Sequence, residues 1–122
     1  GLDLRALLDG PVAIPAGGRA LIPPGIAVGL PSRETVGLVY ARSGLAVKHG
    51  LALSNGVGVI DSDYRGEIVV GMIHLGREPY TLAPGERIAQ LVFTPVLLPP
   101  WEEEQTLDTT GRGTGGFGST GK

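Results

Sequence analysis

The sequence predicts an all-β domain built as a jelly roll or barrel, and three observations lead to this fold class. Apolar residues come in short runs, and helical spacing is nearly absent. Glycine and proline bound these runs, with Gly 21 and Pro 10 among 122 residues. Several of the runs are rich in β-branched residues. Short strands joined by tight turns favour a closed or double-sheet architecture.

The apolar runs define the expected strands in chain order. They cover residues 12–14, 20–22, 26–30, 36–41, 51–53, 68–75 and 88–98, and residues 1–6 form a further short alternating strand. Turn sequences containing proline and glycine separate them at 15–18, 23–25 and 83–85. We expect a helix only in the first turn or two after Ala41.

The C-terminal part of the chain has a different composition. Pro99 and Pro100 end the globular part, because a central strand cannot continue through two prolines. We therefore expect a β-barrel core over 1–100, a linker to a neighbouring subunit over 101–110, and a Gly-rich arm over 111–122. Such an arm is disordered when alone and can order on a ligand.

Charge and composition exclude several classes of protein. A formal net charge of −2 provides no basic field for nucleic acid. The absence of Cys excludes a disulfide framework and fits a reducing compartment, so we expect a cytoplasmic protein. No apolar run approaches the roughly 20 residues of a membrane helix. Because Gly1 already lies in a strand motif without a preceding Met, we expect further residues upstream.

Two segments carry polar groups suited to phosphates. Arg42, Ser43 and Gly44 offer a guanidinium, a hydroxyl and an open N–H, which can cradle phosphate oxygens where a strand meets a short helix. A basic surface turn is the alternative. In the apolar stretch 85–91, Gln90 is an amide that needs a partner, either structural or from a ligand.

Residues 55–67 indicate a hairpin that begins at Asn55 and Gly56. Asp61 follows two apolar residues, which places its carboxylate at a partly desolvated strand end suited to orienting a water. Tyr64 adds a flat apolar face with a polar tip. We interpret Asp63 as a turn residue, and its relation to Asp61 stays open.

The arm carries Arg112 and Phe117 among its glycines. It lacks the Gly-Lys-Ser/Thr ending of a phosphate-binding P-loop. Two interpretations remain for it, a mobile arm that closes on a ligand and a disordered tail.

Together and in this order, the segments resemble the five motifs of the trimeric dUTP diphosphatase (dUTPase) family. The matching segments are Gly-Leu-Asp-Leu-Arg-Ala (1–6), Arg-Ser-Gly-Leu-Ala (42–46), Gly-Val-Ile-Asp-Ser-Asp-Tyr-Arg-Gly-Glu (58–67), Gly-Glu-Arg-Ile-Ala-Gln-Leu (85–91) and Arg-Gly-Thr-Gly-Gly-Phe-Gly-Ser-Thr (112–120). The resemblance covers essentially the whole chain. Ala41 departs from it, because the family usually has Pro there.

The resemblance implies a distorted jelly-roll or β-barrel subunit in a homotrimer with exchange of a C-terminal strand or arm. It implies hydrolysis of dUTP to dUMP and pyrophosphate, which limits uracil in DNA and supplies dUMP for dTMP synthesis. Asp61 would activate the water that attacks the α-phosphate, and Tyr64 would stack under the sugar and exclude a 2′-hydroxyl. Asp3 would meet the water shell of Mg²⁺, whose direct ligands would be substrate phosphates.

The resemblance also assigns the remaining substrate contacts. Uracil would lie against Asn55, Gly58, Val59, Ile60 and Val69; the phosphates would meet Arg42, Ser43, Gly44 and Gln90 of a neighbouring subunit; and the closing arm would supply Arg112, Phe117, Gly118 and Ser119.

Two other functions remain open on the same scaffold. A dCTP deaminase, alone or combined with dUTP hydrolysis, shares the fold, although Tyr64 and the Phe-Gly-Ser end of the arm favour the hydrolase. A non-catalytic dUTP-binding regulatory protein should have lost a catalytic side chain, whereas this sequence retains Asp61, Arg42 and Arg112.

Overall fold

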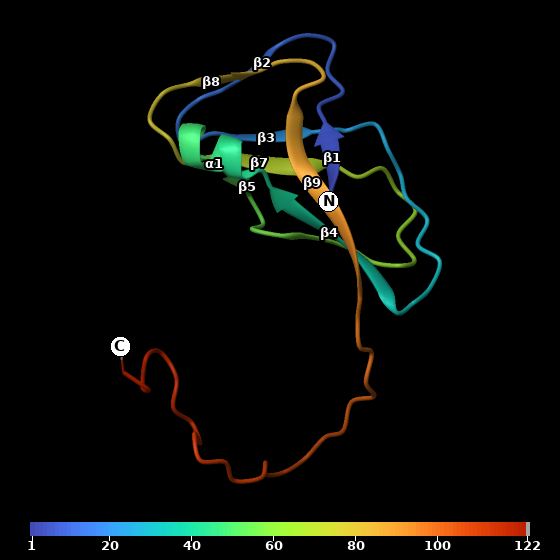
Figure 1. Cartoon of the computed structure of the whole chain (residues 1–122), viewed down its shortest axis with the longest axis vertical. Helices are drawn as coiled ribbons and strands as arrows, with labels where there is room; N and C mark the ends of the chain where they lie inside the picture. Colours follow the sequence, from blue (N-terminus) through green and yellow to red (C-terminus); the bar gives the residue numbers. More distant parts are fainter. Residues whose placement is uncertain (122) are drawn as a thin grey trace.

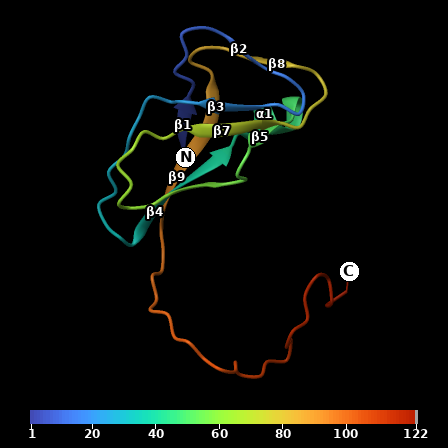
Figure 2. The same ribbon diagram turned by 180° about the vertical axis from the view of Figure 1, so that it is seen from behind.

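A computed structural model describes residues 1–121 and shows a β-stranded body from which a C-terminal arm extends (Figures 1 and 2). The elements are β1 (Leu2–Arg5), β2 (Val12–Ile14), β3 (Arg19–Ile22), β4 (Thr35–Ala41), α1 (Ser43–His49), β5 (Leu51–Leu53), β6 (Gly58–Ile60), β7 (Val70–His74), β8 (Tyr80–Leu82) and β9 (Arg87–Pro95). The predicted all-β class is confirmed, as is the short helix after Ala41. No helix of the described part is long and apolar enough to cross a membrane.

Some strand boundaries differ from the prediction. The run 26–30 lies in a loop, because prolines flank it and limit its pairing; Ile26 O accepts a hydrogen bond from Ile68 N at 2.9 Å. Strand β9 ends at Pro95, short of the predicted residue 98. Strand β8 was not predicted, since Thr81 in its middle leaves no continuous apolar run.

Three antiparallel sheets enclose one apolar core. Their strand orders are β1-β9-β4-β6, β2-β8 and β3-β7-β5. Each sheet contributes fully buried side chains, among them Leu91 of β9, Met72 of β7 and Leu82 of β8. In the largest sheet β4 is an inner strand, paired with β9 on one side and β6 on the other.

The end of α1 packs against the connection between β7 and β8. Gly50 ends the helix in the left-handed conformation (φ 75°), and a Cβ on it would lie 2.4 Å from Gly76 N. His74, which is 1% exposed, holds the connection from inside. Its Nδ1 accepts a hydrogen bond from Gly76 N at 3.0 Å, and its Nε2 lies 2.5 Å from Glu78 O. A ring hydrogen on Nε2 and a free lone pair on Nδ1 satisfy both contacts.

We predict that Gly50→Ala destabilises the protein more than Gly17→Ala. Both glycines have nearly the same φ, 75° and 76°, but nothing lies within 4 Å of a Cβ built at Gly17. Gly17→Ala should therefore cost only the left-handed backbone strain, about 1–2 kcal/mol. Gly50→Ala adds a clash with backbone, roughly 1–3 kcal/mol more. Urea unfolding measures both, and equal costs would show that the Gly50–Gly76 contact is unimportant.

A carboxylate closes the turn between β8 and β9. Glu86 accepts a hydrogen bond from the Tyr80 hydroxyl through Oε1 and from Ala83 N through Oε2 at 2.9 Å. Burial first, and then the Glu86 hydrogen bond and charge, raise the pKa of Tyr80 from 10.0 to about 12. The turn that these contacts hold leads directly into Arg87, the first residue of β9.

The Tyr80 pKa predicts a loss of stability at high pH. Between pH 10 and 12 the unfolded chain releases the phenol proton while the folded chain keeps it, so the stabilisation is complete below pH 10 and falls through this window. Tyr80→Phe should make the free energy of unfolding decline less steeply from pH 10 to 12. Urea titrations at several pH values measure the slope, and parallel curves for both proteins would contradict the assignment.

The arm leaves the body after β9. Val96 N still donates to Glu34 O at 2.9 Å, whereas the backbone hydrogen bonds described beyond it lie within the arm. Its apolar side chains are exposed, and those of Leu97, Trp101 and Phe117 are almost completely so. Both ribbon views show the C-terminal end far from the strands (Figures 1 and 2).

Candidate active site

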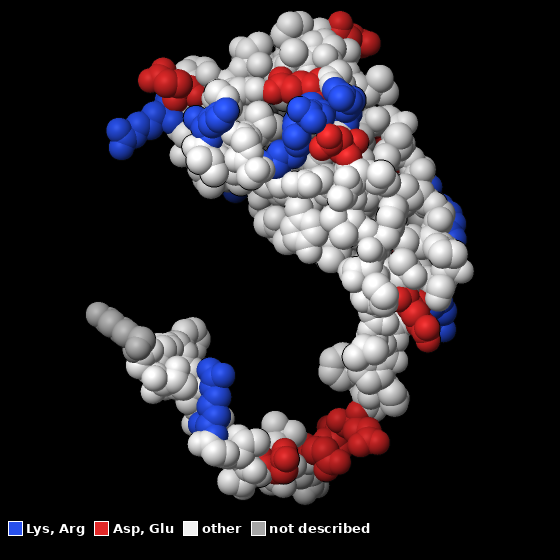
Figure 3. All heavy atoms as spheres, in the orientation of Figure 1, with Lys and Arg blue, Asp and Glu red and all other residues white. Residues whose placement is uncertain are grey.

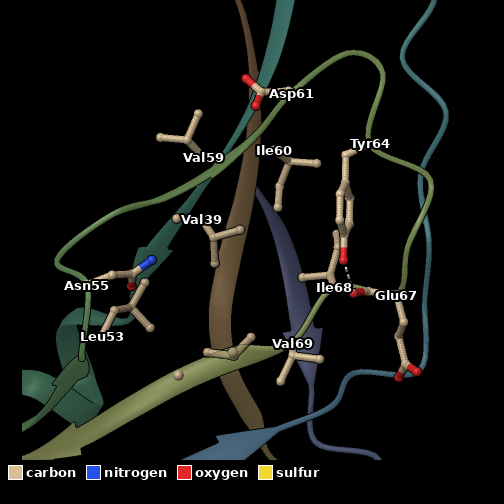
Figure 4. Close-up of a pocket in the computed structure, with 13 residues that line it drawn as sticks. Val39, Leu53, Asn55, Val59, Ile60, Asp61, Tyr64, Glu67, Ile68 and Val69 are labelled. Atoms are coloured by element: carbon tan, nitrogen blue, oxygen red, sulfur yellow. Dashed lines mark hydrogen bonds between the residues drawn. The ribbon is translucent and has the colours of Figure 1, made fainter.

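A cavity of about 290 Å³ opens between the β4–β6 pair and the β5–β7 pair (Figure 4). Its floor is apolar and includes Val39, Leu53 and Ile68. All residues to which the resemblance assigns the activation of water, the sugar contact or the uracil contacts line this cavity. They are Asn55, Gly58, Val59, Ile60, Asp61, Tyr64 and Val69. These residues come from β6 and from the loops on either side of it.

Asp61 lies directly after β6, at the rim of this cavity (Figure 4). It also lines a second cavity of about 500 Å³, together with Asp63 and Arg33. Asp63 is not among the residues that line the first cavity. Both carboxylates line the second cavity, and of the two only Asp61 lines the first.

Tyr64 forms one wall of the cavity (Figure 4). Its hydroxyl donates to Glu67 O at 2.8 Å, and its backbone N–H donates to Asp61 O at 3.1 Å. The side chain is 43% exposed, so a ring face remains available to a flat apolar ligand group.

The opposite end of the cavity is narrow and carries an amide. A Cβ on Gly58 would lie 3.0 Å from Val39 Cβ and 3.8 Å from Asn55 Nδ2, so glycine keeps this corner open. Val69 is 50% exposed at the mouth. An amide beside backbone groups in an apolar pocket can recognise the polar edge of a planar heterocycle.

The predicted phosphate residues form a separate group where β1, β9 and α1 meet. Arg42 immediately precedes α1, whose first residues are Ser43 and Gly44. Gln90 Nε2 donates to Ala41 O at 3.3 Å, so the amide has a structural partner beside the same turn. Figure 3 shows basic and acidic side chains intermixed on this face.

Asp3 links two arginines within this group. Its Oδ1 lies 3.3 Å from Arg42 Nε, and its Oδ2 lies 3.3 Å from Arg87 Nη1. Arg87 was missed by sequence reasoning, although it belongs to the same motif as Gln90. Partly exposed ion pairs contribute little stability, so their main effect is to hold the guanidinium groups in place.

Within one chain, the cavity residues and the predicted phosphate residues lie apart. Ile60, next to Asp61, pairs with Gly37 near the start of β4, whereas Arg42 follows the end of β4. The five residue-to-residue steps from Gly37 to Arg42 span about 17 Å of extended strand. The cavity and the phosphate group therefore lie toward opposite ends of β4.

The arm that carries the predicted residues Arg112, Phe117, Gly118 and Ser119 extends away from the β-stranded body (Figure 1). Their described contacts are local: Arg112 Nε donates to Gly115 O at 2.7 Å, and Ser119 N donates to Gly116 O at 3.0 Å. Phe117 has a positive φ of 49°, which is uncommon for a residue with a side chain.

The donor set fits a metal ion carried by a ligand. Within residues 1–121, no group of three or more His, Cys, Asp or Glu side chains could hold one. A single carboxylate such as Asp3 fits the water shell of Mg²⁺, because this ion keeps several waters and binds mainly through substrate phosphates.

A model of the dUTPase family matches residues 1–121. The chain is 55% identical over 121 residues to the deoxyuridine 5′-triphosphate nucleotidohydrolase of Desulfitobacterium hafniense, which covers 99% of this chain and 80% of that protein.

Solved structures agree. The dUTPase of Streptococcus mutans matches with a TM-score of 0.72 and 34% identity, over 81% of this chain and 80% of that one. A mutant dUTPase of Staphylococcus bacteriophage 80alpha, solved with dUpNHpp, matches with a TM-score of 0.82 and 25% identity, over 98% and 85%. The chain belongs to the dUTPase family.

Proposed function

We propose that this protein is a dUTP diphosphatase, which hydrolyses dUTP to dUMP and pyrophosphate. The observation that carries the proposal is the single cavity lined by Asn55, Asp61 and Tyr64, which combines an amide, a carboxylate and an aromatic wall. The amide suits the polar edge of a pyrimidine, and the carboxylate suits a water that attacks a phosphate. The aromatic wall suits a deoxyribose. The names of its relatives point to the same substrate.

Substrate selection follows from the shape of the cavity. Uracil lies against Asn55 and the backbone of 58–60, with Val69 at the mouth, and the tight fit excludes the thymine methyl. The deoxyribose stacks on Tyr64, which leaves no room for a 2′-hydroxyl and so rejects UTP. A hydrophobic pocket with one set of polar partners discriminates in this way between similar ligands.

Asp61 is the general base. A water attacks the α-phosphorus in line with the leaving group, a P–O bond forms to the water oxygen, and its proton passes to Asp61. The bond from the α-phosphorus to the bridging oxygen breaks, and pyrophosphate leaves. Because charge spreads over phosphate oxygens, catalysis depends on positioning and on cationic donors.

The phosphate donors come from a second copy of the chain in a homotrimer. Arg42, Ser43, Gly44 and Gln90 lie too far from Asp61 within one chain to bind the same triphosphate. The exposed Leu97, Trp101 and Leu107 support packing of residues 101–110 on a neighbour. The arm over 111–122 then closes the site with Arg112, Phe117, Gly118 and Ser119, whose local turns leave it free to move.

Mg²⁺ is the proposed cofactor, and it neutralises triphosphate charge when it is bound. Asp3 would meet the water shell of the bound ion, and the same carboxylate holds Arg42 and Arg87. The proposed setting is the cytoplasm, where the activity limits uracil in DNA and supplies dUMP for dTMP synthesis.

The test is pyrophosphate release from dUTP, dTTP, dCTP and UTP, each with and without Mg²⁺. We expect release from dUTP in the presence of Mg²⁺ and far less from the other three. Asp61→Asn should keep nucleotide binding but lower kcat by at least about 100-fold, the scale of a general base. Ammonia release from dCTP would indicate a deaminase, and normal turnover by Asp61→Asn would contradict the mechanism.

A further inference from the structure

The loop after β6 holds Tyr64 through contacts within the loop itself. The Tyr64 hydroxyl donates to Glu67 O at 2.8 Å, and Tyr64 N donates to Asp61 O at 3.1 Å. Arg65 Nη1 donates to Ser62 O at 2.8 Å and to Tyr64 O at 3.0 Å. These hydrogen bonds all lie within residues 61–67. The position of the Tyr64 ring therefore depends on the atoms of this loop that contact it.

Gly66 lies against the hydroxyl end of the Tyr64 ring. A Cβ on Gly66 would lie 2.5 Å from Tyr64 Oη, 2.7 Å from Cζ and 3.2 Å from Cε2. Contacts below 3.0 Å essentially do not occur for a real Cβ. Any side chain at position 66 must therefore displace the Tyr64 ring, which turns about its own side-chain torsions.

The backbone does not require glycine at this position. The left-handed glycines of residues 1–121 include Gly17, Gly50 and Gly56, and Gly66 is not among them. Alanine can adopt the φ of Gly66 without left-handed strain. What the missing side chain provides here is room for the ring.

We propose that Gly66 is a specificity-determining residue for the sugar, acting through Tyr64; the inference rests on the proposed function. By leaving space for the hydroxyl end of the Tyr64 ring, Gly66 sets how far the ring enters the cavity. It thereby sets how closely the ring face approaches the sugar. A 2′-hydroxyl adds a single oxygen, so a small shift of the ring changes which sugar fits. Gly66 is a positioning residue and touches no substrate atom.

The experiment compares Gly66→Ala with a matched control in steady-state kinetics for dUTP and UTP. Gly66→Ala should raise KM for dUTP and lower the dUTP:UTP ratio of kcat/KM, each by about tenfold or more, because sub-ångström misplacement of a binding group is costly. Its kcat should change less than its KM. Gly29→Ala, at an exposed glycine with nothing within 4 Å of its Cβ, should leave both substrates unaffected.

Two further variants separate the ring from the backbone. In a Tyr64→Leu background, Gly66→Ala should cause no further change, because the group it displaces is gone. Tyr64→Phe removes the bond to Glu67 O and should shift selectivity in the same direction as Gly66→Ala. Equal losses from Gly66→Ala with and without the ring would overturn the inference.

A measurement without turnover completes the test. Ring NMR signals of Tyr64, assigned by their loss in Tyr64→Leu, should shift in Gly66→Ala, while those of Tyr40 and Tyr80 stay in place. An unshifted ring, or an unchanged KM for dUTP, would overturn the inference. A wild-type protein that releases no pyrophosphate from dUTP would overturn the proposed function and the sugar role with it. In that case, a Tyr64 ring signal that shifts in Gly66→Ala would still support the control of Tyr64 by Gly66.

Discussion

The antiparallel pairing of β4 with β9 is the constraint on which the rest of the structure depends. It runs from Thr35 opposite Pro95 to Ala41 opposite Ala89, and β6 adds to the other edge of β4. An extended strand held on both sides does not bend its ends together. Asp61 beside β6 and the polar groups after Ala41 are thereby kept apart. In the proposed mechanism a second copy of the chain completes the site, which links oligomerisation to activity.

The same pairing leaves the cavity well formed without any partner. Val39 of β4 supplies part of its floor, and the other lining residues come from β5, β6, the start of β7 and the loops on either side of β6. In the proposed mechanism, binding begins in this cavity on one subunit, while the charged groups that stabilise the reaction come from another. Because these groups act on charge that develops during the reaction, their contribution appears mainly in kcat.

Sequence reasoning reached the fold class because short apolar runs between glycine and proline are a local signal. The resemblance placed the cavity residues together, and most of them lie in the continuous segment 55–64. The hairpin predicted at this segment was wrong, because β6 pairs with β4 rather than with β5 or β7. The contact of Asp3 with Arg42 and Arg87 could not be predicted, because it depends on the register of β1 against β9. The loop at 26–30 was wrongly predicted as a strand, since an apolar run between prolines can pack without strand pairing. The role of Gly66 became visible only from its distance to the Tyr64 ring.

Mixing two inactive variants tests most directly the claim that the site is shared between copies. Asp61→Asn lacks the base, and Arg42→Ala lacks a phosphate donor, so each alone should be nearly inactive. If subunits are exchanged by co-refolding in equal amounts, about a quarter of the interfaces join two intact halves, and pyrophosphate release from dUTP should recover to about that share of wild type. A mixture no more active than its components would show that each site is built within one chain, which would contradict a site shared between subunits.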